Sequence, residues 1–352
     1  IQEQVIPVIL KGKDVLGIAQ TGSRKTASYV LPVLTSLKPQ EGPKNRQARV
    51  LVLVPTRELA EQVKDVFNTF SSGLSHKVRT VAVYGGVSIN PQMKALYGAA
   101  IVVATPGRLI ELAEANAVQF DQLETLILDE ADKLLNLGFQ EEMNMIFEDL
   151  PAQRQNLLFS ATLNEKVDGI NRVLLKDPVT VNVAPEEWNI SQISQVAYFV
   201  EEEKKGPLLR HLIRKENMQQ VLIFTASGKK ADNVAQKLTK NGIRAKSIHG
   251  KKTQHVRNET LKEFKTGKLR VLVATDLLAR GVDIEFLPYV INYELPRSPK
   301  DYVHRIGRTG RAEATGEAIT LVVPADEHHF KIIQKKMKYW VNRVDGNAIE
   351  LT

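Results

Sequence analysis

Short aliphatic runs alternate along the chain with longer segments whose apolar residues recur every three or four positions. In the first half these runs lie at 14–19, 50–56, 78–86, 99–107, 125–132 and 156–162, and each ends in small, polar or acidic residues. Between two of them, residues 56–70 have helical spacing, with Leu59, Val63, Val66, Phe67 and Phe70 on one face. This alternation predicts an α/β fold with a mostly parallel sheet covered by helices on both faces. Ligands bind such sheets at the carboxyl ends of the strands, where the polar residues would gather.

The alternation is interrupted once and then resumes. Residues 184–192, APEEWNISQ, combine Pro, paired Glu and Asn, and further aliphatic runs follow at 220–227, 243–250, 269–276, 289–296 and 317–324. A chain of 352 residues exceeds what one hydrophobic core usually supports. We therefore expect two domains of one architecture, 1–183 and 193–352, joined by a short linker at 184–192. Residues 341–352 show no clear period and are expected to form a loosely held end.

Charge and composition limit the kinds of molecule that the protein is expected to bind. The net charge is +8 and the isoelectric point is about 9.4. Such a balance favours a polyanionic partner such as nucleic acid, although lysines scattered over a soluble surface would give the same total. The chain has no Cys, which excludes disulfides and thiolate metal sites and fits a reducing, cytoplasmic location. No apolar run approaches the roughly 20 residues of a membrane-spanning helix. The chain begins at Ile1 inside an apparent helix, so we expect a fragment whose tails are missing.

A candidate phosphate-binding loop follows the first aliphatic run. Residues 19–26, AQTGSRKT, match the pattern A/G-x-x-x-x-G-K-T except that Arg24 stands where the pattern has glycine. In such a loop the backbone N–H groups surround the phosphates, Lys25 reaches the outer phosphates and the Thr26 hydroxyl meets Mg²⁺. The loop residues that would surround the nucleotide are Thr21, Gly22, Ser23, Arg24, Lys25 and Thr26. Arg24 adds a β-carbon and a cationic arm, so we expect strain of about 1–3 kcal/mol if the loop needs glycine angles.

An acidic pair supplies the other half of a phosphate-loop site. The segment 123–132, LETLILDEAD, is an aliphatic run that ends in Asp129 and Glu130. Asp129 would hold Mg²⁺, largely through water, and Glu130 would orient and deprotonate an attacking water. Taken singly, an acidic pair after a strand is more often a helix N-cap. Combined with the Lys25 loop, the pattern favours nucleotide hydrolysis.

Eleven motifs in order give the chain a family resemblance. They are Gln2, AQTGSRKT (19–26), PTREL (55–59), Gly85–Gly86, TPGR (105–108), DEAD (129–132), SAT (160–162), VLIFTAS (221–227), HGKKTQHVR (249–257), ATDLLARGVDI (274–284) and HRIGRTGR (304–311). In this order they resemble a DEAD-box ATP-dependent RNA helicase. The amino-acid sequence near HRIGRTGR further resembles that of the bacterial RhlE-type group. The resemblance implies two RecA-like domains, with ATP and Mg²⁺ as cofactors.

The resemblance also implies roles at the matching positions. Gln2 is similar to the glutamine that reads adenine, while Gly281 and Asp283 match nucleotide-contacting positions, Asp283 that of the carboxylate that meets the ribose. Arg308 and Arg311 match the arginine fingers that neutralise charge on the transferring phosphoryl group. The residues that would couple hydrolysis to domain movement are Asp132, Ser160, Thr162, Arg280 and His304. His304 taken alone also fits an ordinary packed histidine.

RNA contacts are implied on both domains. They would come from Thr56, Arg57, Gly86, Thr105 and Arg108 in the first domain and from Gln254, Arg257 and Thr275 in the second. Glycines and small hydroxyls let a phosphate backbone approach main-chain N–H groups, and arginines add charge, so such contacts position a strand without reading its bases. Choice of RNA over DNA would rest on 2′-hydroxyls.

Three functions remain open from the sequence. The favoured one is an ATP-dependent RNA helicase that locally unwinds or remodels RNA, with hydrolysis impaired by Arg24. Arg24 also leaves open a non-catalytic, ATP-gated RNA clamp, and a DNA-directed motor is a third. The resemblance further implies a monomer that recruits ribosome-assembly or RNA-decay proteins through missing tails.

Overall fold

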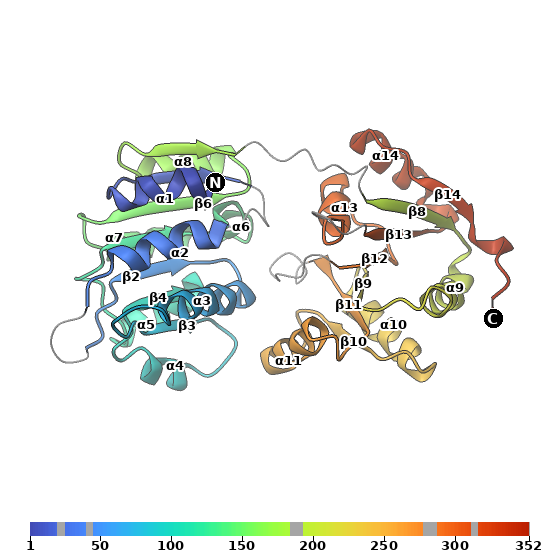
Figure 1. Ribbon diagram of the computed structural model, residues 1–352, viewed down its shortest axis with the longest axis horizontal. Helices are drawn as coiled ribbons and strands as arrows, with labels where there is room; N and C mark the ends of the chain where they lie inside the picture. Colours follow the sequence, from blue (N-terminus) through green and yellow to red (C-terminus); the bar gives the residue numbers. More distant parts are fainter. Residues whose placement is uncertain (20–24, 40–44, 184–192, 277–286, 311–315, 352) are drawn as a thin grey trace. The chain divides into compact units, whose positions relative to one another are not determined.

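The computed structural model describes residues 1–19, 25–39, 45–183, 193–276, 287–310 and 316–351. The chain divides into two compact units, Ile1–Pro185 and Glu186–Thr352, which we call unit 1 and unit 2. Each contains a parallel sheet with helices packed on it (Figure 1), so the α/β class expected from the sequence is confirmed. The predicted linker, 184–192, lies outside the described residues.

Unit 1 alternates strands and helices along most of its length. Its elements are α1 (Gln2–Leu10), β1 (Val15–Ile18), α2 (Lys25–Ser36), β2 (Val50–Leu53), α3 (Arg57–Ser71), β3 (Thr80–Val83), α4 (Ile89–Ala95), β4 (Ile101–Ala104), α5 (Pro106–Glu114), β5 (Thr125–Leu128), α6 (Ala131–Asn136), α7 (Gln140–Glu148), β6 (Gln155–Ser160), α8 (Glu165–Leu174) and β7 (Val179–Asn182).

Unit 2 repeats this alternation. Its elements are β8 (Ser194–Phe199), α9 (Glu202–Lys215), β9 (Val221–Phe224), α10 (Gly228–Lys240), β10 (Ala245–Ile248), α11 (Gln254–Lys265), β11 (Val271–Ala274), β12 (Tyr289–Asn292), α13 (Pro299–Ile306), β13 (Glu317–Val322), the 3₁₀ turn η2 (Pro324–Asp326), α14 (Glu327–Met337), β14 (Asn342–Asp345) and the 3₁₀ turn η3 (Gly346–Ala348).

The two sheets have the same topology. Their strand orders are β3-β4-β2-β5-β6-β1-β7 and β10-β11-β9-β12-β13-β8-β14. When the strands of each unit are counted from its own first strand, both orders read 3-4-2-5-6-1-7. The pairings are parallel, as where Val15 of β1 lies beside Leu157 of β6 and Val179 of β7. All strands of a sheet therefore end at one edge, where the loops to the following helices begin.

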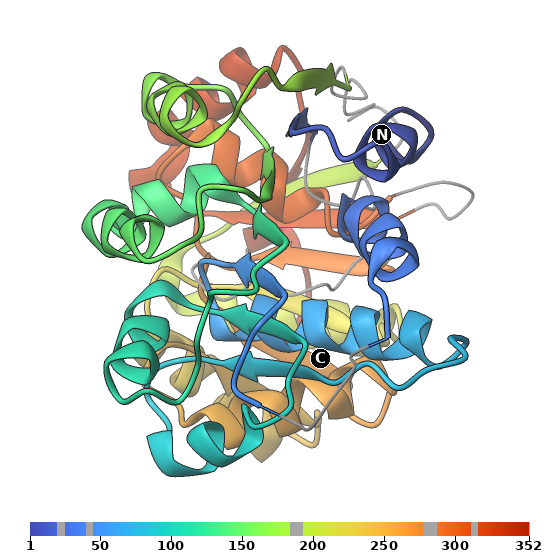
Figure 2. The same ribbon diagram turned by 90° about the vertical axis from the view of Figure 1, so that its left-hand side faces the viewer.

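Alternate residues of each strand in unit 1 enter cores on opposite faces of the sheet. In β2, Leu51 and Leu53 join the core under α5 to α8, while Val50 and Val52 join the core under α1 to α3. Figure 2 shows α1 and α2, in dark blue, and α7 and α8, in green, on opposite sides of this sheet. Because both faces are covered, the strands read as continuous aliphatic runs rather than as an alternating pattern.

The predicted apolar face of α3 is buried except at its end. Leu59, Val63 and Phe67 are buried in the core shared with α1 and α2, and Val66 packs against its margin. Phe70, in the last turn, is 42% exposed. The helix expected over this stretch is confirmed, and its packing follows the 3.6-residue period.

The expectation of a loosely held end at 341–352 is wrong for most of this segment. Residues Asn342–Asp345 form β14, which pairs with β8 in register Asn342 to Val196. The strand has no apolar periodicity because most of its side chains are exposed. It is held instead by backbone hydrogen bonds and by the Arg343 guanidinium, which lies 3.7 Å from the Phe199 ring centre. The periodicity of apolar residues does not reveal exposed edge strands of this kind.

Candidate functional site

The lysine of the candidate phosphate loop lies at the carboxyl edge of the sheet in unit 1. Lys25 begins α2, is 6% exposed, and its Nζ donates a hydrogen bond of 2.8 Å to the carbonyl of Ala19, directly after β1. The cation therefore lies between the end of β1 and the amino end of α2. That helix end presents N–H groups and a positive dipole, which suit a phosphate.

A buried tyrosine joins the start of α2 to the acidic pair. The Tyr29 hydroxyl donates a hydrogen bond of 2.9 Å to Oδ2 of Asp129, and the two residues are 0% and 2% exposed. Burial, followed by the charge of Asp129, raises the pKa of Tyr29 well above its ordinary value, although a hydrogen bond with Thr26 opposes this. Tyr29 thus remains a protonated donor. The two predicted Mg²⁺-contacting residues, Thr26 and Asp129, both lie next to its hydroxyl.

Glu130 has an unusual backbone and a buried carboxylate. Its φ of 54° and ψ of 46° place it in the left-handed region, and its N–H donates to Oδ1 of Asp129 at 2.9 Å. Oε1 accepts a 2.6 Å hydrogen bond from Nζ of Lys133, whereas Oε2 is buried with no partner among the described residues. Burial raises the pKa of Glu130, and Lys133 opposes that rise. Strained residues with unsatisfied buried oxygens are typical of sites that await a ligand or water.

The last Asp of DEAD holds the SAT segment. Its Oδ1 accepts from the Ser160 hydroxyl at 3.1 Å and from the Ala161 N–H at 3.3 Å, and Oδ2 accepts from the Thr162 hydroxyl at 3.4 Å. Ser160 ends β6, and its carbonyl accepts from the N–H of Ala19 at the start of the phosphate loop. The structure therefore brings together Asp132, Ser160 and Thr162, which the sequence assigned to one role.

The PTREL and double-glycine segments meet through Arg57 and Gly86. A β-carbon built on Gly86 would lie 2.2–2.5 Å from the guanidinium of Arg57, and Gly86 has a φ of +74°. Glycine is favoured there, because it tolerates positive φ and has no β-carbon to displace the guanidinium of Arg57. Thr56 caps α3 by accepting from the N–H of Leu59 at 3.2 Å.

Arg108 joins the TPGR segment to the same region. Its Nε pairs with Glu111 at 2.9 Å and one terminal nitrogen donates to the carbonyl of Val87 at 3.0 Å, while the other terminal nitrogen is buried without a partner among the described residues. Thr105 precedes α5, and its N–H donates to the carbonyl of Val83. Because β2, β3 and β4 end at one edge, the five residues predicted to contact RNA in unit 1 gather there.

The three predicted RNA contacts of unit 2 follow the equivalent strands, β10 and β11. Gln254 and Arg257, in the first turn of α11, hydrogen-bond to each other and are each 6% exposed. Thr275, directly after β11, lines a cavity of about 580 Å³. Lys229, His249, Lys251 and Arg297 also line this cavity. It lies where β9, β10, β11 and β12 end.

One buried arginine of unit 2 was missed by the sequence reasoning. Arg305 of α13 is 2% exposed and forms a fork with Asp276, with Nε–Oδ1 of 2.6 Å and Nη2–Oδ2 of 2.8 Å. Its third nitrogen donates to Oδ1 of Asn292 at 3.1 Å and to the carbonyl of Glu294 at 2.6 Å. Arg305 thus fixes the residue after Thr275, beyond the end of β11, to the end of β12. The sequence did contain a signal for this pair, because Asp276 lies in the motif at 274–284 and Arg305 lies in the motif at 304–311.

Comparison with known proteins identifies the family. Residues 1–170 match the DEAD/DEAH box helicase model, and residues 204–313 match the helicase conserved C-terminal domain. A DEAD-box ATP-dependent RNA helicase CshA of Geobacillus kaustophilus is 37% identical over 351 residues, covering 99% of this chain and 74% of that protein. The chain belongs to the DEAD-box family.

Other DEAD-box relatives are longer than this chain. CshA of Streptococcus pneumoniae is 42% identical over 351 residues, which are 99% of this chain and 66% of that protein. The chain thus spans about two thirds of the length of such relatives. The RhlE-type assignment stays a prediction, since these relatives bear the name CshA.

Solved DEAD-box structures share the fold. A crystal structure of a DEAD box protein from Methanococcus jannaschii has a TM-score of 0.55 and 32% identity, covering 98% of this chain and 92% of that one. Saccharomyces cerevisiae Dbp5 bound to RNA and ADP BeF3 has a TM-score of 0.83 and 28% identity, covering 99% of this chain and 90% of that one. The RecA-like helicase fold expected from the resemblance is therefore confirmed.

Several predicted DEAD-box site residues lie outside the described residues. These are Thr21, Gly22, Ser23, Arg24, Arg280, Gly281, Asp283 and Arg311. Gln2 begins α1, which packs on α2. His304 is half-buried in the last turn of α13, and Arg308 is 8% exposed just after it. Their predicted roles stay predictions.

The part of the chain that the structure describes lacks two further features. No group of three or more His, Asp or Glu side chains there could hold a metal ion. None of its helices combines the length and apolarity that crossing a bilayer requires.

Proposed function

We propose that the chain is the ATP- and RNA-binding core of a helicase that locally unwinds or remodels RNA, without sequence specificity, as it hydrolyses ATP. The carboxyl edge of the sheet in unit 1 is the observation that carries this proposal. It gathers the phosphate-loop lysine, the buried acidic pair, the SAT hydroxyls and the residues predicted to contact RNA along one edge of one sheet. Coupling ATP hydrolysis to RNA binding requires a phosphate-binding site next to a site that holds the RNA backbone.

The residues at this edge fit a magnesium nucleotide. Lys25 and the amino end of α2 would bind the outer phosphates, and Gln2 the adenine. The buried carboxylate of Asp129 and the Thr26 hydroxyl are hard oxygen donors of the kind that Mg²⁺ accepts directly or through water. The bound cation would neutralise charge on the phosphates. Tyr29 contributes by fixing the carboxylate of Asp129 with its 2.9 Å hydrogen bond.

Glu130 would act on the attacking water. Its Oε2 has no donor among the described residues, while Lys133 holds Oε1. A water that donates to Oε2 would be oriented by a group fixed at both its backbone and its side chain. Asp132, bonded to the hydroxyls of Ser160 and Thr162, would transmit phosphate loss to the SAT segment. Arg308 and Arg311 belong to unit 2, so the proposed reaction needs both units.

The RNA strand would be held through its backbone. Thr56, Gly86 and Thr105 lie between β2, β3 and β4 and the helices that follow these strands, and Arg57 and Arg108 add charge beside them. In unit 2, Gln254 and Arg257 lie in the first turn of α11, which follows β10, and Thr275 follows β11. Contacts of this kind fix position without reading bases. RNA would be preferred to DNA through its 2′-hydroxyls.

Arg24 makes the rate of hydrolysis the sharpest test of the proposal. If strain and crowding by this side chain misplace the outer phosphates, Arg24→Gly raises RNA-stimulated phosphate release at least about tenfold, or about 1.4 kcal/mol in barrier. Arg24→Ala recovers less, since it removes the arm and keeps the β-carbon. RNA affinity without nucleotide stays unchanged in all three proteins, because the RNA-contacting residues lie elsewhere.

Three outcomes would revise the proposal. Equal, vigorous turnover in the three proteins would show that the loop accepts arginine. No turnover in any, with ATP-dependent RNA binding intact, would favour a non-catalytic RNA clamp, the second function that Arg24 itself suggests. Preference for DNA over RNA duplexes would favour a DNA motor. The whole protein is expected to work in the cytoplasm as a monomer and to meet ribosome-assembly or RNA-decay proteins through segments outside this chain.

A further inference from the structure

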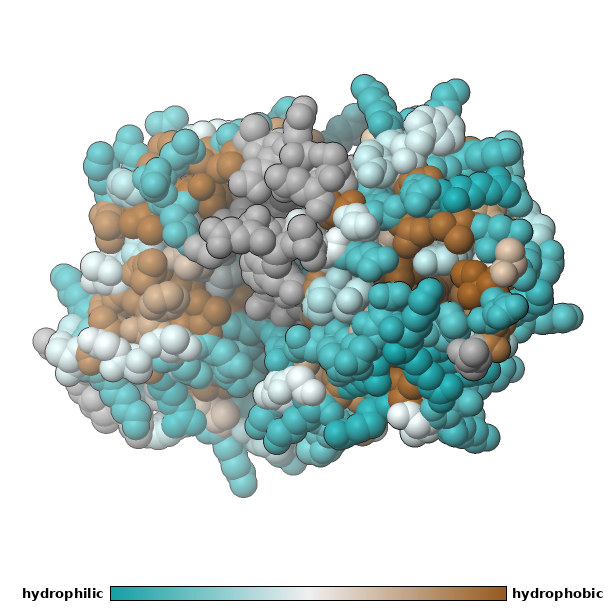
Figure 3. All heavy atoms as spheres, turned by 45° about the vertical axis from the view of Figure 1, so that its right-hand side comes forward, coloured by the Kyte–Doolittle hydropathy of each residue, from teal (hydrophilic) through white to brown (hydrophobic). Residues whose placement is uncertain are grey.

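The positive charge of the protein is concentrated in one part of unit 2. Residues 228–270 contain 13 Lys and Arg residues against 3 Asp and Glu residues, whereas the whole chain has a net charge of +8. The rest of the chain therefore has a slight excess of acidic residues. This segment forms α10, β10 and α11 and leads into β11. In Figure 3 the lower part of unit 2, at the height of α10 and α11, is predominantly hydrophilic.

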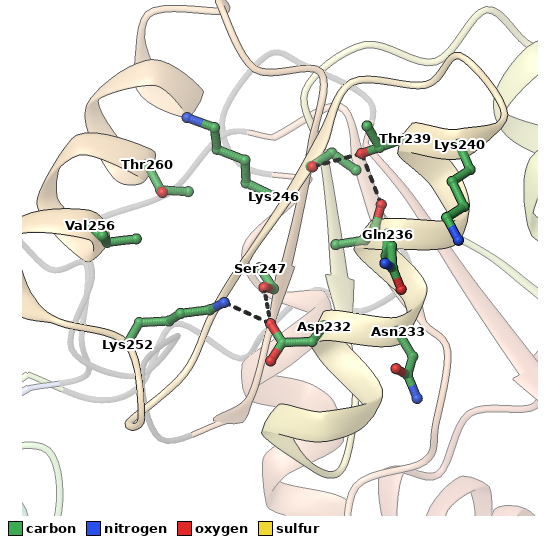
Figure 4. Close-up of a pocket in the computed structure, with 12 residues that line it drawn as sticks. Asp232, Asn233, Gln236, Thr239, Lys240, Lys246, Ser247, Lys252, Val256 and Thr260 are labelled. Atoms are coloured by element: carbon green, nitrogen blue, oxygen red, sulfur yellow. Dashed lines mark hydrogen bonds and ion pairs between the residues drawn. The ribbon is translucent and has the colours of Figure 1, made fainter.

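A groove follows the outer edge of β10 within this segment. β10 is the end strand of its sheet, and α10 and α11 flank it to enclose a cavity of about 530 Å³. Figure 4 shows Asn233, Gln236 and Lys240 arranged along α10, with Lys246 and Lys252 on the other side of the cavity. One of the twelve residues that line it, Asp232, carries a carboxylate, and eight carry an amide, a hydroxyl or an ammonium group. These groups suit phosphates and sugar hydroxyls better than apolar side chains.

The lysines of this groove are only partly neutralised. Lys252 pairs with Asp232 at 2.9 Å, and Lys246 pairs with Glu263 at 2.7 Å. Lys240 and its exposed neighbour on α10, Lys237, form no salt bridge with a carboxylate of the described residues. The groove therefore keeps a net positive charge that an anionic ligand would offset.

The edge of β10 is poorly suited to an added peptide strand. The strand has four residues, and the Thr239 hydroxyl already donates to the outward carbonyl of Ala245 at 3.0 Å. Lys246 also lies within it, and short, lysine-bearing edges resist strand addition. A polyanion would contact the charged groups and hydroxyls of the groove, whereas a peptide strand would need free backbone groups of β10. The groove therefore fits a polyanion better than a peptide.

The groove adjoins the cavity that contains Thr275. Asp232, which lines the groove, accepts from the Ser247 hydroxyl at 2.5 Å and contacts Nε2 of His249 at 3.1 Å. His249 lines the Thr275 cavity. Asp232 and His249 therefore form a shared wall, and a strand leaving one cavity would meet the other.

We propose that the groove between α10 and α11 is a second RNA-binding site, which holds the phosphate backbone of an RNA strand beyond the part bound at the Thr275 cavity. This proposal rests on the proposed binding of RNA by the two units and adds a second site to it. The site adds affinity for long RNA through charge and does not read sequence. It does not contribute to the binding of RNA too short to reach it.

RNA length and salt dependence test the groove without nucleotide present. The variant Lys240→Gln/Lys246→Gln is compared with the parent and with a control of equal charge change on α14, Lys335→Gln/Lys336→Gln. For oligouridylate of about 20 nucleotides we expect the groove variant to bind about tenfold more weakly, with a salt slope reduced by about 1.4, or about 0.7 per lost contact. For oligouridylate of about 6 nucleotides all three proteins should bind alike. Thermal unfolding confirms that each variant is folded.

The outcomes separate this inference from the proposed function. If the parent binds neither RNA, the RNA-binding core itself is refuted. If it binds both and the groove variant matches the α14 control, or loses short and long RNA equally, the second site is refuted. Acetylation of lysines gives an independent measure, in which the long RNA should protect Lys240 and Lys246 but not Lys335 and Lys336. Protection by a polyglutamate peptide and not by RNA would assign the groove to an acidic protein instead.

Discussion

The phenol of Tyr29 and the carboxylate of Asp129, which are 100 residues apart in the chain, meet in a buried hydrogen bond of 2.9 Å. This bond fixes α2, which begins with the phosphate-loop lysine, to the end of β5, where the acidic pair begins. Two parts of one site are thus held together by a contact in which Asp129 belongs to a motif and Tyr29 does not. The contact predicts a measurable dependence of stability on a single hydroxyl.

Tyr29→Phe should destabilise unit 1 by about 1.5–3 kcal/mol, because the buried carboxylate of Asp129 loses a donor. Urea unfolding measures the loss. Tyr302→Phe is the matched control, because Tyr302 is equally buried but bonds a neutral hydroxyl, that of Thr320, at 3.0 Å. Its loss should be smaller, at about 1 kcal/mol. Equal losses would mean that the charge of Asp129 does not strengthen the bond.

Glu130→Gln should lower ATP hydrolysis by at least about 100-fold while leaving ATP-dependent RNA binding in place, because an amide cannot accept the proton of the attacking water. Phosphate release and RNA binding are measured, in the Arg24→Gly background if the parent protein does not hydrolyse ATP. Glu141→Gln, an exposed change on α7, provides the control. A variant that keeps most of its turnover would remove Glu130 from the proposed role.

Gly86→Ala should weaken RNA binding and destabilise unit 1 by about 1–3 kcal/mol, since its β-carbon meets Arg57 and its φ is positive. Gly85→Ala is a close control, because a β-carbon there has nothing within 4 Å. RNA affinity and urea unfolding are measured for both. Two variants of similar behaviour would show that the contact between Arg57 and Gly86 is not what requires glycine.

Asp232 should give unit 2 a stability that is lost in acid. Burial alone would raise the pKa of Asp232, but hydrogen bonds from Ser247, Lys252 and His249 lower it to about 2. The unfolded value is about 3.9, so the stabilisation is complete above about pH 4 and disappears as the pH falls toward 2. It should stay below about 1 kcal/mol, because the side chain is 43% exposed.

Urea unfolding at several pH values tests the role of Asp232. The difference in free energy of unfolding between the parent and Asp232→Asn should be constant above about pH 4 and should shrink below it. A difference that grows toward low pH would contradict the depressed pKa.

The alternation of aliphatic runs and helical segments was sufficient to predict the fold class and the edge where the site lies. Strands covered on both faces, such as β2 and β5, appear directly as aliphatic runs, and parallel topology then places Thr56 and Asp129 at one edge. β7 and β14 could not be found this way, because most of their residues are at least partly exposed.

The motifs indicated which residues matter but not how they are held. Tyr29 and Arg305 were not assigned, because their importance depends on partners distant in sequence, Asp129 and Asp276. A buried charge or phenol needs a partner, but a single sequence does not reveal which one. The left-handed backbone of Glu130 and the packing of Arg57 on Gly86 likewise appear only in three dimensions.

The strand order also governs when each unit can fold during synthesis. In both sheets the first strand lies between the last two, with β1 between β6 and β7, and β8 between β13 and β14. A chain emerging from the ribosome therefore leaves β1 and β8 without their neighbours until the end of each unit has been made. Pairings so distant in sequence slow folding and lengthen the exposure of apolar strands. Each sheet is completed late in translation, and unit 1 can be complete before β8 exists.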